Sequence, residues 1–466
     1  MVVMPVLFTS ARELERHINR LEVHYLAGHE GEVHFALLSD WTDSATESAP
    51  GDDALFASAT DGIARLNARY GPAPGGARFL LLHRRRIWNE SQRMWIGWER
   101  KRGKLHELNR LLRGATDTSF LSMDGWPPEV PSGVRYVITL DADTRLPRGT
   151  VKRLVGKMAH PLNIPTLDPS NRRVVAGYAV LQPRVTPLFP SAREGSMFNQ
   201  VFTSPSGLDP YAFAVSDVYQ DLFGEGSYIG KGIYDVDAFE TALEGRIPES
   251  TLLSHDLLEG IFARSGLLSD IEVVEEFPSR YDVATARQHR WARGDWQLLP
   301  WIFGRDAKSG KVAIPPIGRW KMLDNLRRTL SAPAAFVALL VGWTLPADAA
   351  LFWTGFVVAT FAVPPLLAPF GGILPRASGI SQRRHWRGVG VDFGLASLQI
   401  TFTLAVLAHQ AWLMADAVTR TLSRLYLSRQ RLLEWTDAAS LTSRTALDAR
   451  AFYRLMTGGI ALAAVA

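Results

Sequence analysis

Two long stretches near residue 340 contain no charged side chain. The first covers residues 329–345 and the second covers residues 349–370. A helix rises about 1.5 Å per residue, so an apolar helix of roughly 17–25 residues crosses the hydrocarbon core of a membrane. The two stretches therefore predict a pair of membrane helices, and a buried hairpin of a soluble protein is the alternative.

A third apolar stretch, 391–414, is interrupted by polar residues that include Asp392 and His409. Arginines cluster on both sides of it, within 371–390 and within 416–456. Positive residues beside membrane helices favour the cytoplasmic side, so one crossing here would leave one basic stretch outside. We therefore expect both basic stretches to be cytoplasmic, with the apolar stretch lying in the membrane interface as an amphipathic helix.

These patterns divide the 466 residues into four parts. Residues 1–318 form a soluble domain, 319–370 a basic interfacial helix and two transmembrane helices, 371–456 cytoplasmic or interfacial amphipathic helices, and 457–466 the start of a truncated transmembrane helix. This ending predicts that the chain is a fragment. The chain has no cysteine, which excludes disulfides, thiolate chemistry and zinc–cysteine sites.

Short apolar strands and amphipathic helices alternate in the soluble part. Strands are predicted at 4–10, 32–44, 77–86 and 135–140, and helices at 11–28, 52–70 and 98–114. This alternation indicates parallel βαβ units, whose ligands bind at the carboxyl ends of the strands. The predicted fold class is α/β with a Rossmann-like, mostly parallel central sheet. The signatures of a classical dinucleotide site and of a P-loop, GxGxxG and GxxxxGK[ST], are both absent.

Two of the predicted strands end in pairs of acidic residues. Asp40 and Asp43 follow one strand, and Asp141 and Asp143 follow another in YVITLDAD. Two carboxylates one residue apart suit Mg²⁺ or Mn²⁺, which bridges to a diphosphate and neutralises its charge as it departs. An isolated DxD at a strand end can also form an Asx turn, which is the alternative.

Two later motifs add chemistry to this pattern. In STLLSHDLLEG, Asp256 lies in an apolar stretch and is a candidate general base; the alternative is a helix N-cap formed by Ser254 or Asp256. In ARQHRWARGDW, Arg290 offers a planar fork to phosphate oxygens and Trp291 offers an indole face to a sugar ring. A tryptophan-rich helix at the membrane interface is the alternative for the second motif.

The order of these motifs, followed by membrane helices, resembles the processive inverting glycosyltransferases with a glycosyltransferase-A fold, such as cellulose and hyaluronan synthases. Those enzymes carry a T/E-E-D base motif and Q-x-x-R-W, whereas this chain has SHD and has Arg287 at the position of the Gln. Five phrases are similar to the glycosyltransferase domain of the cyclic β-1,2-glucan synthases over most of 75–302: WERKRGKLHELNRLLRG, YVITLDADTRLPRGT, GEGSYIGKGIYDVDAFE, SHDLLEG and RQHRWARGDWQLLPWI.

This resemblance implies a role for each motif residue. On the nucleotide side, Asp40 and Asp43 would hold uracil and ribose, and the segment ERKRGK (99–104), with Arg102 and Lys104, would line the nucleotide pocket. Asp141 and Asp143 would bind UDP through Mg²⁺ or Mn²⁺, and Arg290 would hold the diphosphate. On the acceptor side, Gly230, Lys231 and Gly232 would form a loop, Trp291 would hold the acceptor sugar, and Asp256 would be the base.

The resemblance also implies a metal-dependent single displacement that polymerises glucose from UDP-glucose into β-1,2-glucan. The partners would be UDP-glucose, the growing glucan chain and the lipid bilayer, with no nucleic acid. The catalytic domain would be cytoplasmic at the bacterial inner membrane, and a longer protein would add preceding membrane helices and C-terminal glucan-processing domains. The family starts its chain on a tyrosine of the protein, and nothing distinguishes one of the 11 tyrosines here. Three alternatives stay open: a processive synthase with another sugar nucleotide or linkage, a membrane scaffold, and a metal-dependent phosphohydrolase.

Overall fold

An eight-stranded sheet forms the centre of the part before α9, called the sheet domain here, in the order β3–β2–β1–β6–β11–β10–β12–β7. Its strands are β1 (Val2–Phe8), β2 (Phe35–Trp41), β3 (Phe79–Arg84), β6 (Tyr136–Thr139), β7 (Thr144–Arg145), β10 (Val180–Pro187), β11 (Gly232–Asp235) and β12 (Ser265–Glu275). The computed structural model describes residues 1–121, 128–170, 172–188, 196–203, 217–304, 314–374, 381–434 and 449–465.

Strand direction follows the prediction in one half of the sheet and departs from it in the other. β3, β2, β1 and β6 are mutually parallel, as the βαβ pattern predicts. β11 then runs antiparallel to both β6 and β10, while β12 is parallel to β10 and β7 is antiparallel to β12. The carboxyl ends of β2, β6 and β12 therefore meet at the same edge as the beginning of β11.

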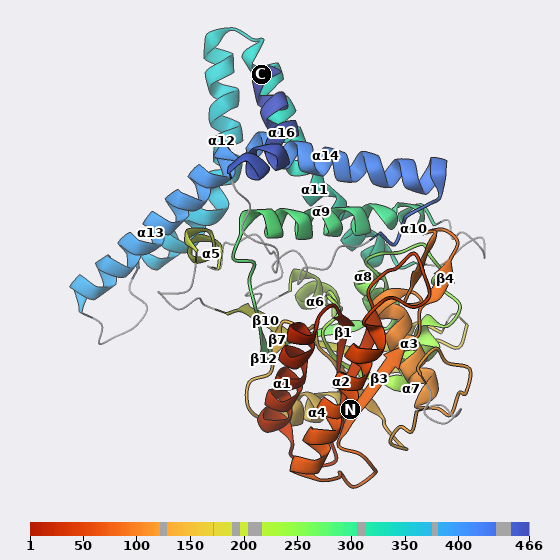
Figure 1. Cartoon of the computed structure of the whole chain (residues 1–466). Helices are drawn as coiled ribbons and strands as arrows, with labels where there is room; N and C mark the ends of the chain where they lie inside the picture. Colours follow the sequence, from red (N-terminus) through yellow and green to blue (C-terminus); the bar gives the residue numbers. More distant parts are fainter. Residues whose placement is uncertain are drawn as a thin grey trace.

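Helices cover both faces of the sheet, so its strands are apolar on both sides (Figure 1). One face packs against α1 (Ala11–Gly28), α2 (Asp52–Tyr70) and α4 (Thr150–Met158), and the other packs against α3 (Arg100–Leu111) and α7 (Val236–Leu243). In β1, Val2 and Met4 pack in the first layer and Val3 in the second, which is the period of two expected of a strand.

Short elements accompany the sheet domain. Two-stranded ribbons are formed by β4 (Ile87–Asn89) with β5 (Met94–Ile96) and by β8 (Thr166–Leu167) with β9 (Val174–Ala176). The short helices are η1 (Pro161–Asn163), α5 (Met197–Phe202), α6 (Val218–Phe223), α8 (Asp256–Phe262) and α10 (Leu299–Ile302). α8 begins close to the sheet edge where β6 ends, which places its first turn beside the strand-end acids.

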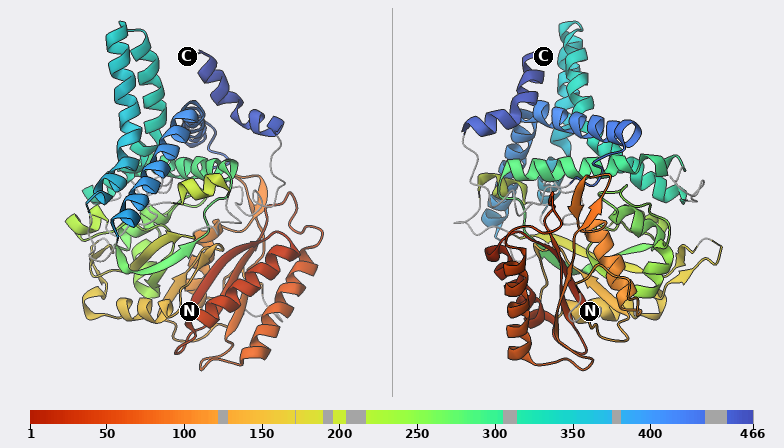
Figure 2. Two further views of the ribbon diagram at one scale, coloured as in Figure 1. Left: turned by 90° about the vertical axis from the view of Figure 1, so that its left-hand side faces the viewer. Right: turned by 45° about the vertical axis from the view of Figure 1, so that its right-hand side comes forward.

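Long helices stand on the side of the sheet where β2, β6 and β12 end. They are α9 (Tyr281–Gln297), α11 (Pro316–Trp343), α12 (Ala347–Gly372), α13 (Gln382–Ala405), α14 (Leu407–Ser423) and α16 (Ala449–Val465). A short π-helical turn, η2 (Arg424–Ser428), follows α14. α11 and α12 form a hairpin that rises away from the sheet (Figures 1 and 2). α9 and α14 lie side by side across the base of this hairpin.

The helices on this side agree with the predicted segments in one place and differ from them in another. The interfacial helix and the first apolar stretch form one continuous helix, α11, that passes through Pro333. The stretch 391–414 is two helices, because the chain turns at Val406 between α13 and α14. The continuous helix agrees with a basic helix that leads into the first apolar stretch, whereas the turn inside the third apolar stretch was not predicted.

Among the described residues, two helices are long and apolar enough to cross a membrane, α12 and α13. α12 agrees with the second predicted span. α11 does not qualify: after Arg327 and Arg328 only 15 residues, 329–343, remain before the helix ends at Trp343. α13 qualifies although its stretch was expected in the interface, so that expectation stays a prediction. The parts of the two basic stretches at 375–380 and 435–448, with Arg376 and Arg444, lie outside the described residues.

Candidate active site

A cavity of about 1440 Å³ opens at the sheet edge and extends to the long helices beyond it. Its lining comes from β2, α3, the ends of β6 and β12, α8 and α9, and it continues to α11–α14. Eight of the predicted site residues line it: Asp40, Lys104, Asp141, Asp143, Lys231, Asp256, Arg290 and Trp291. Asp43, Arg102, Gly230 and Gly232 lie outside this lining.

Three carboxylates meet at the edge of the sheet. Asp141 and Asp143 follow β6, and Glu275 is the last residue of β12. Each offers an oxygen, and these oxygens lie within 4.8 Å of one another. They meet because β6 and β12 run in the same direction. Glu275 was missed by the sequence reasoning, although its strand ends in acids just as β2 and β6 do.

Lys231, expected in a loop on the acceptor side, lies among these carboxylates. Its Nζ is 2.6 Å from Glu275 Oε2 and 3.2 Å from Asp141 Oδ2. Lys231 directly precedes β11, and β11 runs antiparallel to β6, so the residue arrives at the edge where the acids end. The loop expected on the acceptor side thus supplies a cation to the acidic cluster.

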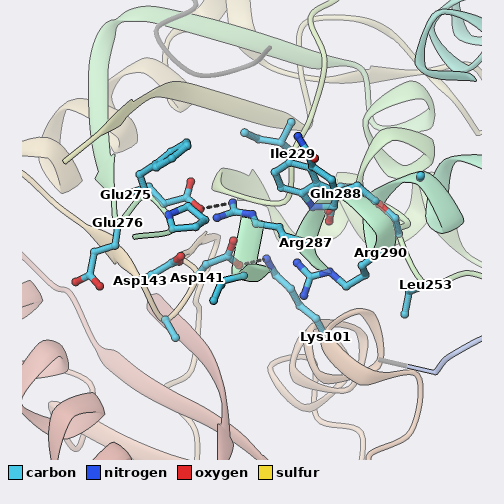
Figure 3. A pocket seen from close by; sticks show the side chains of 18 of the residues that line it. Lys101, Asp141, Asp143, Ile229, Leu253, Glu275, Glu276, Arg287, Gln288 and Arg290 are labelled. Atoms are coloured by element: carbon cyan, nitrogen blue, oxygen red, sulfur yellow. Dashed lines mark hydrogen bonds and ion pairs between the residues drawn. The ribbon is translucent and has the colours of Figure 1, made fainter. Parts of the chain in front are cut away.

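Two further cations, Lys101 and Arg287, reach the cluster. The sequence reasoning included Lys101 only as part of the segment ERKRGK and assigned no role to Arg287. Lys101 Nζ donates to Asp141 Oδ1 at 2.5 Å and to the Gly230 carbonyl at 2.8 Å. Arg287 Nη2 donates to Glu275 Oε1 at 2.6 Å, and its guanidinium lies 4.6 Å from the centre of a Trp291 ring. In Figure 3, Lys101, Arg287 and Arg290 gather around Asp141.

Helical spacing explains why Lys101 reaches the site and Arg102 does not. Lys101 and Lys104 are three residues apart on α3 and share the face that lines the cavity. Arg102 faces away and donates to Glu99 at 2.6 Å. This helical spacing is the signal that could have singled out Lys101, together with Lys104, as the residues of ERKRGK that face the cavity.

Neighbouring cations compensate the three carboxylates to different extents. Burial raises the pKa of Asp141, but Lys101 and Lys231 outweigh burial and hold that pKa well below its usual range. Burial of Glu275 is likewise outweighed by Lys231 and Arg287, which lower its pKa to about 2. Burial and the charge of Glu275 raise the pKa of Asp143 to about 6. Within the described ranges, Asp143 forms no ion pair, so its charge is the least compensated of the three.

This donor set fits Mg²⁺ or Mn²⁺. Both are hard cations that take oxygen ligands, and Asp141, Asp143 and Glu275 supply carboxylate oxygens close together. The poorly compensated charge of Asp143 gives a cation at this point a favourable electrostatic environment. Lys231 already lies between the other two carboxylates and would share them with the cation.

Asp256 opens α8 without serving as its cap. The N-cap residue is His255, which makes no capping hydrogen bond with its side chain, and Asp256 is the first helical residue. Gly230 has a φ of +82°, and a Cβ at that position would lie 2.6 Å from Asp256 Oδ1. The glycine therefore allows the Asp256 carboxylate to lie directly against the loop whose carbonyl binds Lys101.

Asp40 and Asp43 are held by arginines of the protein. The Asp40 carboxylate accepts hydrogen bonds from Arg84 at 2.8 and 3.0 Å and lies 3.2 Å from Lys104 Nζ. Burial raises the pKa of Asp40, but Arg84 and Lys104 outweigh burial and lower it to about 2. Asp43 pairs with both terminal nitrogens of Arg100, at 2.9 and 2.7 Å. Both acids therefore contribute structure to the β2 side of the site.

α9 carries the RW motif across the edge of the sheet. Arg290 and Trp291 line the cavity from this helix. The opposite side of α9 packs against α14, where His289 Nε2 lies 2.8 Å from Asp416 Oδ2. α9 thus joins the acidic cluster to α14, and the Trp291 side chain lines the cavity.

No family model matches the chain. Over all 466 residues it is 50% identical to the cyclic beta-(1,2)-glucan synthase NdvB of Rhizobium meliloti (strain 1021), and it spans 16% of the length of that relative. The shared segment includes the DxD, SHD and RW motifs that line the cavity. The resemblance predicted from these motifs is confirmed: the chain is homologous to one segment of a much longer cyclic β-(1,2)-glucan synthase.

Proposed function

We propose that the chain is the glycosyltransferase segment of a glucan synthase and has the glycosyltransferase-A fold. In this proposal it transfers glucose from UDP-glucose to a growing β-1,2-glucan with inversion at the anomeric carbon. The observation that carries the proposal is the meeting of three carboxylates, several cations and Asp256 in one cavity. The similarity to a named cyclic glucan synthase supports the product class.

The donor would bind at the acidic cluster. A divalent cation held by Asp141, Asp143 and Glu275 would neutralise charge on the diphosphate. Lys101 and Arg290 line the same space and would donate to phosphate oxygens, since arginine and lysine both bind phosphate in this way. Arg287 and Lys231 are paired with Glu275 and would hold that carboxylate in position.

The nucleotide's base and ribose would lie toward β2 and α3. Asp40 would act from the floor of this pocket through Arg84 and Lys104, and Asp43 would act through Arg100. The resemblance implies that Asp40 and Asp43 contact the nucleotide directly, whereas in this proposal they act through Arg84, Lys104 and Arg100. The ion pairs fix the backbone that surrounds the nucleotide.

The acceptor would bind between Trp291 and Asp256. The indole would cover the apolar face of the terminal glucose, while the Asp256 carboxylate takes the proton of its 2-hydroxyl. The hydroxyl oxygen then forms a bond to the anomeric carbon as the bond from that carbon to the diphosphate breaks. UDP leaves with the bonding electrons, and attack from the opposite face gives the β linkage.

The membrane would be a partner of this reaction. We propose that α11–α14 anchor the site at a bacterial inner membrane with the sheet domain in the cytoplasm. The low burial of the apolar windows of α12 and α13, 6% and 17%, supports contact with lipid. Preceding membrane helices and C-terminal glucan-processing domains would belong to a longer protein, and so would the choice of a priming tyrosine.

The test is incubation of membranes that contain the chain with labelled UDP-glucose and Mg²⁺ or Mn²⁺, followed by linkage analysis. We expect label in a metal-dependent polymer with β-1,2 linkages. Incorporation from another sugar nucleotide, or another linkage, would identify a different processive synthase. Absence of both metal-dependent UDP binding and incorporation would refute the proposal and favour a membrane scaffold.

A further inference from the structure

The first turn of α8 carries a second group of metal-binding side chains. His255, Asp256 and Glu259 each offer a ligand atom, and these atoms lie within 4.8 Å of one another. His255 Nε2 is 3.5 Å from Asp256 Oδ1 and 3.8 Å from Glu259 Oε1. His255 has helical backbone angles, so it shares a helix face with Glu259 four residues later.

His255 is the unusual member of this group. Its side chain is only 7% exposed, and its buried Nε2 has no hydrogen-bond partner. A buried polar atom without a partner costs about 1–3 kcal/mol. The structure thus contains a buried imidazole nitrogen that faces two carboxylates.

We propose that His255, Asp256 and Glu259 form a second metal site, selective for a transition-metal dication of the Zn²⁺ class. Tetrahedral zinc has bonds of roughly 2.0–2.1 Å, which places neighbouring ligands about 3.4 Å apart. The observed separations from His255 Nε2, 3.5 and 3.8 Å, need only small side-chain adjustments to match.

The ligand types separate this site from the acidic cluster. An imidazole nitrogen favours zinc and related metals, whereas an all-oxygen set suits Mg²⁺. His255 and Asp256 both line the cavity, which gives the metal an entry path and an open fourth position.

The second site has a consequence for the reaction, which rests on the proposed function. Asp256 is the proposed base, and a carboxylate oxygen that is bound to a metal no longer accepts a proton. Zn²⁺ at this site would therefore inhibit glucosyl transfer while Mg²⁺ at the acidic cluster supports it. The site would act as a brake that senses the free concentration of transition metal.

The binding test uses Co²⁺ as a visible probe for zinc-type coordination. The full chain in detergent is titrated with Co²⁺ in the presence of excess Mg²⁺, which fills the acidic cluster. We expect the intense visible bands of tetrahedral Co²⁺, their loss on addition of Zn²⁺, and their absence in His255→Asn and Glu259→Gln. The matched control is His29→Asn, at an exposed histidine far along the chain, which should keep the bands.

The outcomes separate the site from the proposed function. Bands that persist in both site variants, or no bands in the unaltered chain, would overturn the second site. The activity arm is a Zn²⁺ titration of glucosyl transfer at fixed Mg²⁺, with each protein scaled to its own uninhibited rate. We expect the midpoint to rise at least about tenfold in Glu259→Gln, and an unchanged midpoint would refute the brake. Histidine-dependent bands in a chain without any transfer would overturn the proposed function and retain the site.

Discussion

Asp40→Asn removes one negative charge from a cluster of ion pairs that water does not reach. The Arg84 side chain is 0% exposed, and the Asp40 carboxylate binds it through both oxygens. With Asn in place, Arg84 keeps Glu107 as its ion-pair partner at 3.0 Å, and Lys104 keeps the Val6 carbonyl at 2.8 Å. The change leaves the shape of the side chain almost unaltered, so the effect reports on charge.

The expected loss of stability follows from two considerations. Burial raises the pKa of Asp40, but Arg84 and Lys104 outweigh it and bring the pKa from 3.8 to about 2. At about 1.4 kcal/mol for each pKa unit, this change corresponds to about 2–3 kcal/mol. Removing one partner of a buried ion pair typically costs about 3–5 kcal/mol. We therefore expect Asp40→Asn to lower the free energy of unfolding by about 2–5 kcal/mol.

The assay is thermal unfolding of the purified chain in detergent, followed by tryptophan fluorescence. At about 2–4 °C for each kcal/mol in a large domain, Tm should fall by at least about 4 °C. The matched control is Asp43→Asn, whose pair with Arg100 is partly exposed, with side chains 25% and 14% accessible. This pair is more accessible to water than the Asp40–Arg84 pair, so Asp43→Asn should lower Tm less than Asp40→Asn does.

The pH dependence gives a second readout. Because the folded-state pKa of Asp40 is lowered, its contribution to stability is present above the ordinary pKa of 3.8 and is lost as pH falls toward 2. The gap in Tm between the unaltered chain and Asp40→Asn should therefore be full at pH 6 and narrower at pH 3. A variant that melts normally but loses UDP affinity would refute the reasoning, since Asp40 would then contact the nucleotide directly.

Three further predictions concern catalysis and topology. Asp143→Ala should abolish glucosyl transfer while Tm changes little, because it removes the least compensated carboxylate of the cluster; retained transfer would mean that the metal binds elsewhere. Asp256→Asn should leave UDP binding intact and lower turnover by roughly 10²–10⁴, the usual contribution of a general base, and an unchanged rate would exclude that role. Single cysteines at Ser381 and Ser428 should both be shielded from a membrane-impermeant maleimide in spheroplasts, and labelling of only one would show that 391–414 spans the bilayer.

Local signals were sufficient for the first half of the sheet domain. The predicted helices at 11–28 and 52–70 have the bounds of α1 and α2. Ser10 accepts a hydrogen bond from the Glu13 backbone N–H, a cap that the adjacent residues alone can form. The strand before Asp141 is likewise found from its own apolar residues. Such elements depend on neighbours in sequence, so the sequence determines them.

The helices after α9, from α11 to α16, could be predicted less well from the sequence, because their ends depend on packing. Apolar content located α12, but α11 continues through Pro333, although an interior proline usually costs a helix about 3 kcal/mol. The turn at Val406 has no proline or glycine to mark it. There α13 leaves toward α12, while α14 packs on α9 and α16. These contacts join segments that are far apart in the chain, so local composition does not predict them.

The site itself shows the same division. Asp141, Asp143, Asp256 and the RW motif were identified in the sequence, because each motif is short and has a chemical role that can be read from residue type. The positions of Lys231 and Glu275 depended on the direction in which β11 and β12 run beside β6. Strand direction is set by hydrogen bonds between segments about 100 residues apart and by burial of both faces of the sheet. The sequence by itself thus determined which residues could do the chemistry, and only the tertiary structure decided which cations would surround the acids.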